Sequence, residues 1–79
     1  MRADLQQLVT EAEARSLPIL RIWDPDDDPM VGWLPFIVVE RPIDDPDVQE
    51  LIGTAIAAGL FVAALRAGDG DRTIIELPG

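Results

Sequence analysis

The chain has 79 residues, of which 48% are hydrophobic and 5% aromatic, and 15 acidic residues against six arginines give it a formal net charge of −9. This apolar content is too high for a chain kept unfolded by its charge. The length limits it to one small core, so we expect a single folded domain over residues 1–79. Cysteine, histidine, lysine and tyrosine are absent. Their absence removes disulfides, the usual zinc ligands and most catalytic bases and nucleophiles, so we expect neither an enzyme nor a cofactor.

The first residues of the chain are polar and amphipathic, and they lack the apolar segment of a secretory signal peptide. A secreted protein of this length normally relies on disulfides, so the lack of cysteine favours a cytoplasmic location. The chain is rich in Ala, Asp, Gly, Pro and Arg and contains no Lys, Asn or Tyr. This bias is typical of a GC-rich bacterial genome, or of a phage or mobile element that lives in one.

A helix is predicted over residues 3–15. Its apolar residues at positions 5, 8, 9 and 12 follow the spacing that places side chains on one stripe of a helix. Pro18 prevents the helix from continuing, because the ring of a proline disfavours the helical conformation of the residue before it.

Two short strands are predicted next, over residues 17–23 and 34–40, because both segments are rich in β-branched residues and bounded by prolines. Arg21 interrupts the apolar residues of the first strand, which favours an edge strand with one face in water. The second strand is apolar on both faces, which favours a central position in a sheet. The segment 24–33 between them is too long for a two-residue hairpin turn, and we expect it to form an acidic loop.

A second helix is predicted over residues 46–67. Asp44 or Asp45 is expected to cap its start, and Gly68 is placed to follow its last turn. A strand over residues 72–77 is expected to complete the fold. The expected order is helix, strand, strand, helix, strand, which describes an α+β domain in which two helices pack on a three-stranded mixed sheet.

The predicted second helix is uncharged from residue 51 to residue 65, a stretch too short to span a bilayer. Much of this stretch is apolar on every side of a helix, so something must bury it. Small residues recur every four positions, at 55, 59, 63 and 67, and such a ridge allows another backbone to approach closely. Two interpretations stay open: the helix packs between the first helix and the sheet, or it forms the seam of a homodimer.

The negative charge is concentrated in residues 24–50, where nine acidic residues accompany Arg41 alone and give this segment a net charge of −8. Prolines that follow Asp24 and Asp28 favour an extended backbone at these two residues. Extended residues two apart are separated by about 6.6 Å, which resembles the spacing of phosphates along a nucleic-acid strand. The loop is therefore expected to present a row of negative charge to a basic groove. The alternative is a solvated acidic loop that keeps the protein soluble.

A second acidic cluster lies at the start of the predicted second helix, where capping and the helix dipole also explain its residues. Trp23 and Trp33 bracket the acidic loop. Tryptophan is enriched at binding hot spots, and it also packs in protein cores. Both interpretations stay open for these two residues. The residues expected to contact a partner are Asp24, Asp26, Asp27, Asp28, Trp33, Asp44, Asp45, Asp47 and Glu50.

A calcium site is not expected in the acidic loop. Asp24, Asp26 and Asp28 match the first three ligand positions of an EF-hand loop, but prolines occupy the positions that require a glycine and a bidentate glutamate. The negative charge also disfavours direct binding of nucleic acid.

One short segment of the chain resembles a known family. Residues 23–33 contain Trp23-Asp24-Pro25, Pro29 and Gly32-Trp33, and this pattern resembles the tryptophan-bearing segment of MbtH-like proteins. Proteins of that family are small partners of the adenylation domains of peptide synthetases. The resemblance implies an accessory subunit of a larger enzyme.

In its length, acidity and lack of catalytic groups, the chain also resembles small acidic inhibitors of phages and mobile elements, anti-CRISPR proteins among them. Residues 24–29 and 44–50 carry this likeness. It implies a non-catalytic inhibitor, a nucleic-acid mimic that occupies the basic nucleic-acid-binding site of a partner protein. Two other functions stay open: a structural or assembly protein that dimerises through the second helix, and a small accessory subunit.

Overall fold

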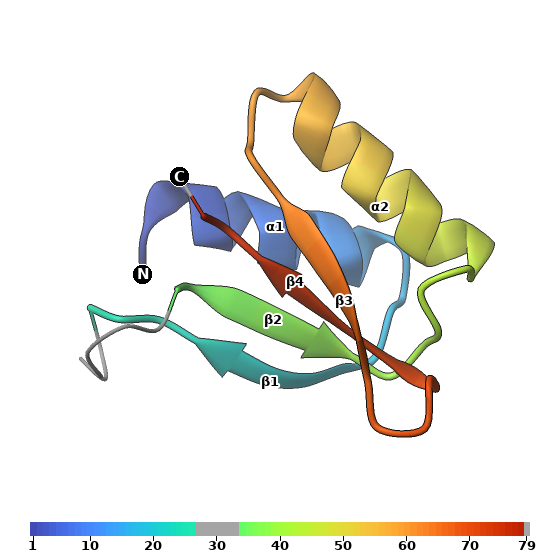
Figure 1. The fold of residues 1–79 in the computed structure, drawn as a ribbon. Coiled ribbons are helices and arrows are strands. Elements are labelled where there is room, and N and C mark those ends of the chain that lie inside the picture. The colour runs from blue at the N-terminus through green and yellow to red at the C-terminus, as the bar shows by residue number, and fades with distance from the viewer. Residues whose placement is uncertain (27–33, 79) are drawn as a thin grey trace.

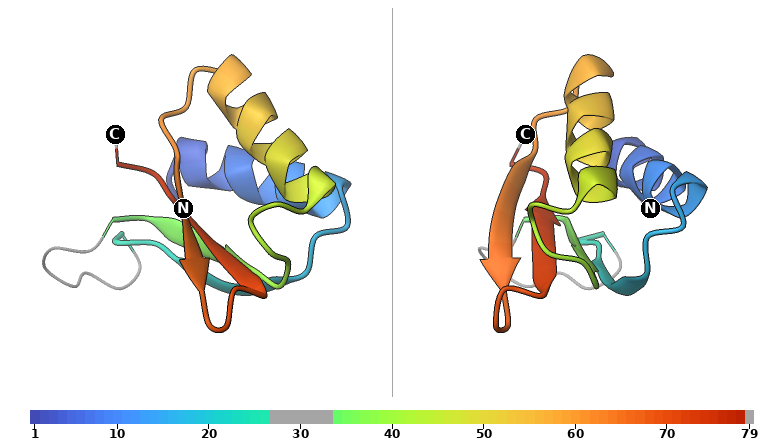
Figure 2. Two further views of the ribbon diagram at one scale, coloured as in Figure 1. Left: turned by 45° about the vertical axis from the view of Figure 1, so that its right-hand side comes forward. Right: turned by 90° about the vertical axis from the view of Figure 1, so that its right-hand side faces the viewer.

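A computed structural model describes residues 1–26 and 34–78 as two helices and four strands. All neighbouring strands are antiparallel, in the order β1-β2-β4-β3, and both helices lie on one face of the sheet (Figures 1 and 2). The predicted α+β class is confirmed. The prediction of a three-stranded mixed sheet was wrong, because the sheet has four strands and all its pairs are antiparallel. The elements follow one another as α1 (Ala3–Ala14), β1 (Ile19–Trp23), β2 (Phe36–Val39), α2 (Pro46–Ala57), β3 (Ala63–Ala67) and β4 (Arg72–Glu76).

Helix α1 ends one residue earlier than predicted, in a tight turn. Ser16 has a φ of 56°, and Leu17 N donates to Ala12 O over 3.1 Å while Ser16 N donates to Glu13 O over 3.0 Å. These two hydrogen bonds form a Schellman motif, which satisfies carbonyls that the end of a helix otherwise leaves unpaired. The left-handed position is usually taken by glycine, and here a serine occupies it.

Helix α2 ends at Ala57, ten residues before the predicted end. Gly59 has a φ of 89°, and the bonds from Leu60 N to Ala55 O and from Gly59 N to Ile56 O, each 3.0 Å long, form a second Schellman motif. The turn brings Leu60 and Val62 back against the core. The predicted ridge of small residues therefore does not exist, because its members beyond residue 57 are not helical.

The missed element is β3, which forms a hairpin with β4 through residues 68–71. Gly68 and Gly70 have φ values of 61° and 94°, a region that glycine enters without a steric cost. Gly68 therefore belongs to a hairpin turn and not to the end of a helix. Strands β1 and β2 each start two residues later than predicted, at Ile19 and Phe36, and β2 ends at Val39. Their predicted positions are confirmed, since β1 lies at an edge and β2 lies between β1 and β4.

The main core fills the space between the helices and the sheet. Each helix contributes one apolar stripe, and β2 and β4 contribute alternate residues, as expected for a sheet covered on one face. Ile37 pairs with Ile75 at the centre of this face. The buried members of the core are Leu5, Leu8, Val9, Ala12, Leu17, Ile37, Val39, Val48, Leu51, Ala55, Ile75 and Leu77.

Trp23 and Phe36 lie outside this cluster, on the opposite face of the sheet. They are register partners on β1 and β2, and their rings stack with centroids 6.0 Å apart. Both side chains are buried. Trp23 is thus a packing residue, while Trp33 lies outside the described residues.

Candidate functional site

The acidic residues of segment 24–50 lie at two ends of the sheet. Asp24 and Asp26 follow the end of β1, next to the start of β2, whereas residues 40–50 follow the other end of β2 (Figure 1). Strand β2 runs between the two clusters. The described residues therefore form two separate acidic regions, and the single contact surface expected from the sequence is not formed by them.

Asp24 is buried, so it does not present its charge to solvent. Its Oδ1 accepts a hydrogen bond from the backbone N–H of Asp26 over 3.0 Å, and its Oδ2 lies 3.8 Å from the amino nitrogen of Met1. This local bond turns the chain at residues 25–26, so the expected extended row does not begin at Asp24. Asp26 is exposed. Asp27, Asp28 and Trp33 lie outside the described residues, as does most of the segment that resembles MbtH-like proteins.

The second cluster lies where α2 begins. Asp45 is the N-cap: its Oδ1 accepts from the backbone N–H groups of Asp47, over 2.9 Å, and Val48, over 3.4 Å. Its Oδ2 lies 4.0 Å from Arg41 Nε. Asp44 and Asp47 are exposed, and no ion pair to either is found within residues 1–26 and 34–78. Capping thus occupies Asp45, while its two acidic neighbours stay open to solvent.

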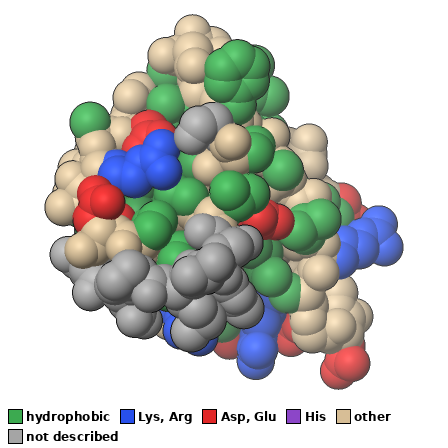
Figure 3. Space-filling view, turned by 60° about the vertical axis from the view of Figure 1, so that its left-hand side comes forward, with side chains coloured by type: hydrophobic (Ala, Val, Ile, Leu, Met, Phe, Trp, Pro, Cys, Tyr) green, Lys and Arg blue, Asp and Glu red, His purple; other side chains and the backbone are tan. Residues whose placement is uncertain are grey.

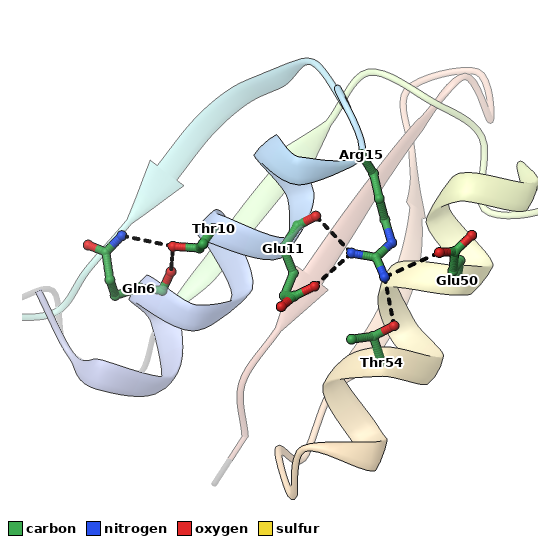
Figure 4. Close-up of polar contacts among 6 residues, drawn as sticks. All are labelled: Gln6, Thr10, Glu11, Arg15, Glu50 and Thr54. Carbon is green, nitrogen blue, oxygen red and sulfur yellow. Dashed lines mark hydrogen bonds and ion pairs between the residues drawn. The ribbon is translucent and has the colours of Figure 1, made fainter.

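Glu50 lies one turn further along α2 and takes part in a contact between the two helices. Arg15 Nη2 lies 3.3 Å from Glu50 Oε1 and donates to Thr54 Oγ1 over 2.8 Å (Figure 4). The other nitrogen, Nη1, donates to Glu11 Oε2 over 2.7 Å and to the Glu11 carbonyl over 3.0 Å. The hydrogen bond to Glu11 raises the pKa of the Arg15 guanidinium, although partial burial opposes this shift. Arg15 therefore keeps its positive charge and neutralises part of this region.

We call the residues Glu40, Asp44, Asp45, Asp47 and Glu50 the acidic end. Its five carboxylates are accompanied within residues 40–50 by Arg41 alone. Asp69 and Asp71 of the β3–β4 turn lie at the same end of the sheet, because Val39 pairs with Thr73 and the Thr73 hydroxyl donates to Arg41 O over 2.8 Å. Two arginines, Arg66 and Arg72, flank this turn and lie at the same end. Figure 3 shows the side of the molecule that carries the chain termini, where acidic side chains lie beside basic and hydrophobic ones.

A groove that the sequence did not indicate runs between α1 and the edge of β1. Its volume is about 440 Å³. Ile19 and Ile22 point toward the helix side of the sheet, since Ile22 is the register partner of the core residue Ile37. The spacing of apolar residues along each element predicts which face is buried, but not how far α1 reaches across the sheet. The residues that line the groove are Val9, Glu13, Leu17, Ile19, Leu20, Arg21 and Ile22.

In the part of the chain that the structure describes, no group of three or more acidic side chains is arranged to hold a metal ion. Neither of the two described helices is long and apolar enough to cross a membrane. Comparisons of the chain with family models, with curated proteins and with solved structures find no match. The geometry and charge of the chain itself therefore carry the functional inference.

Proposed function

We propose that the protein is a non-catalytic binding protein that places its acidic end against the basic nucleic-acid-binding surface of a partner protein and blocks that surface. One observation carries this proposal: Asp44 and Asp47 are exposed beside the start of α2, without an ion pair to any described residue. Exposed carboxylates that are not engaged in an ion pair attract a cationic surface and speed the encounter with it. They also repel nucleic acid, so the partner is a protein.

The acidic end supports this function better than the region around Asp24. The Asp24 carboxylate is buried, which leaves Asp26 as the exposed acid of residues 24–26. At the acidic end, by contrast, Asp45 holds the helix start in place through backbone hydrogen bonds. Residues on either side of this cap are therefore presented from a fixed backbone. Preorganised charges lose less conformational freedom when they bind than charges on a mobile chain do.

The test compares two double variants with the same net charge. The protein is first used to capture a partner from its native host, and the affinity for that partner is then measured at several salt concentrations. We expect Asp44→Lys with Asp47→Lys to weaken binding by about tenfold or more and to reduce its salt dependence. The control is Asp26→Lys with Glu76→Lys, which changes two acidic residues at the other end of the sheet and is expected to have a smaller effect.

Competition supplies the second half of the test. We expect duplex DNA or RNA to displace the protein from its partner, since both ligands are proposed to occupy one basic surface. Two results contradict the proposal: equal weakening by both double variants, which would mean that only net charge matters, and a partner that binds nucleic acid and this protein at the same time. Circular dichroism of each variant shows whether the fold is kept.

Self-association is a second candidate function, and the C-terminal end of α2 supports it. Ile56 is 58% exposed and Phe61 is 75% exposed, so two large apolar side chains face solvent near the turn at Gly59. Hydrophobic side chains are visible at the top of the molecule in Figure 3, the end at which α2 terminates in Figure 1. Exposed apolar patches of this kind mark contact sites when they are large enough.

Sedimentation equilibrium tests this second function. If the protein dimerises through this patch, Phe61→Ser converts the dimer to a monomer. The control Leu65→Ser, which removes an exposed apolar side chain from β3, leaves the dimer intact. A wild-type protein that is monomeric at all accessible concentrations excludes assembly as its function.

A further inference from the structure

Strand β1 is an edge strand whose outer side is unoccupied by any strand of the described chain. It pairs with β2 on one side only, in the order β1-β2-β4-β3. Backbone N–H and C=O groups at alternate residues of an edge strand point away from the sheet, and they offer hydrogen bonds to another extended chain. The register between β1 and β2 shifts between Ile19 and Arg21, so the pairing is irregular at Leu20.

The groove beside α1 runs along this edge. Helix α1 buries its stripe over the centre of the sheet and leaves the margin at β1 uncovered. Ile22 is consequently 39% exposed although its register partner Ile37 is fully buried. Leu20, which also lines the groove, is 48% exposed. The volume of about 440 Å³ lies within the range of sites that bind small ligands or peptide side chains.

The opposite edge of the sheet provides a contrast. Strand β3 is also an edge strand, and its Leu65 is 48% exposed, the same fraction as Leu20 on β1. The groove, however, is lined by residues of α1, of β1 and of the connection between them, and not by β3. Strand β1 therefore combines an open backbone edge with a place for side chains, which is the combination that strand-adding sites use.

Glu13 lies on the α1 side of the groove and Arg21 on the β1 side. Neither forms an ion pair with another residue in 1–26 or 34–78. Glu13 therefore offers a carboxylate to a cationic side chain at the rim of an apolar floor. The net charge of −9 of the whole chain favours a cationic segment further.

We infer that the β1 edge and its groove bind an extended segment of a partner protein, which adds to the sheet as a fifth strand. Its alternate side chains, on the face toward α1, are apolar and enter the groove, and a lysine or arginine among them meets Glu13. This surface is distinct from the acidic end, so the inference goes beyond the function proposed above. Backbone pairing supplies affinity in such complexes, and the alternate side chains supply specificity.

A second copy of this chain is a less suitable occupant. Two β1 strands that pair antiparallel around a two-fold axis at Arg21 place one guanidinium opposite the other, and like charges directly opposite destabilise a strand pair. The pairing also brings together two chains that each carry a net charge of −9. A cationic, alternating apolar segment avoids the second obstacle, and it avoids the first when its lysine or arginine lies beside Glu13 and not opposite Arg21.

The experiment selects peptides from a phage-displayed library of random nonapeptides on the immobilised wild-type protein. We expect the enriched sequences to alternate apolar, β-branched residues with polar ones and to contain a lysine or arginine. Affinity of a synthetic enriched peptide should fall by about tenfold or more for Ile22→Asp and for Leu20→Asp. It should stay unchanged for Leu65→Asp, the matched change on β3, and fall moderately for Glu13→Gln.

Hydrogen exchange distinguishes strand addition from contact between side chains alone. On binding of the peptide, amide protons of β1 that face away from β2 should exchange more slowly, because they become hydrogen bonded. Three results overturn the inference: no enrichment over a background selection, equal binding to Ile22→Asp and Leu65→Asp, or a wild-type dimer that Ile22→Asp dissociates. None of these bears on Asp44 and Asp47, so the proposed function is tested separately.

Discussion

Arg15, the residue that follows α1, donates a hydrogen bond from Nη2 to the hydroxyl of Thr54 on α2 over 2.8 Å, across 39 positions of sequence. The same guanidinium contacts Glu11 of its own helix and Glu50 of α2. A planar guanidinium with several fixed donors suits such a junction. The helices thus meet through the polar contacts of Arg15, beside the apolar stripes that pack them on the sheet (Figure 4).

Replacement of Thr54 by valine tests the contribution of this contact. The change keeps the shape of the side chain and removes the acceptor for Arg15, so we expect the free energy of unfolding to fall by about 1 kcal/mol. Chemical denaturation measures it. The control is Thr10→Val: the Thr10 hydroxyl is exposed and donates to the Gln6 carbonyl of its own helix, so its loss should change stability by less than about 0.5 kcal/mol. Equal effects at both positions would mean that the contact between the helices adds nothing.

Substitution of Ser16 by glycine is expected to stabilise the protein. Ser16 has a φ of 56°, in the left-handed region, where a side chain costs about 1–2 kcal/mol relative to the ordinary helical region. Glycine removes this cost but gains freedom in the unfolded chain, so we expect a net gain of about 0.5–1 kcal/mol. A rise in the thermal midpoint verifies it, and a fall would show that the Ser16 side chain contributes a contact of its own.

Two alanine substitutions in α2 and its C-terminal turn should have opposite effects. Gly53 lies within the helix with no other atom near the position of an added Cβ, so Gly53→Ala should stabilise the protein by about 0.5–1 kcal/mol. Gly59 has the same free space but a φ of 89°, so Gly59→Ala should destabilise it by about 1 kcal/mol. Both are measured by denaturation. If Gly59→Ala is also stabilising, the helix continues past residue 57, and the predicted longer helix is restored.

Removal of the α2 N-cap has a defined expected cost. Asp45→Ala deletes the acceptor of two backbone N–H groups, and such changes cost about 1 kcal/mol. Asp44→Ala removes the neighbouring exposed carboxylate without a capping bond and should stay within about 0.5 kcal/mol of the wild type. The comparison separates the structural aspartate of the acidic end from one that the proposed function uses. A larger loss for Asp44→Ala would reverse these roles.

Much of the fold was predictable where the pattern is local. The stripe at positions 5, 8, 9 and 12 is buried, and the helix over it is one residue shorter than expected. Asp45, one of the two candidates for the cap, is the N-cap of α2. The apolar character of residues 36–39 favoured an interior strand, and β2 does lie between β1 and β4. On the face away from the helices, Phe36 is buried and stacks on Trp23.

Strand β3 was not predictable in this way. Ala63, Ala64 and Ala67 are strong helix formers, so local propensity favours continuation of α2 through them. The structure places them in a strand because the turn at Gly59 returns Leu60 and Val62 to the core and β3 then pairs with β4. Strand preference depends on such neighbours more than on the residue itself.

By itself, the sequence determined the total charge, the cap at the start of α2, the apolar stripe that α1 buries, and the lack of the usual catalytic side chains. These properties depend on residue type and on neighbours within a few positions. Only the tertiary structure decided that Asp24 is buried, that it lies at the other end of the sheet from Asp44, and that a groove borders β1. Such relationships follow from the path of β2 and the reach of α1 across the sheet, and both are set by contacts between residues far apart in the chain.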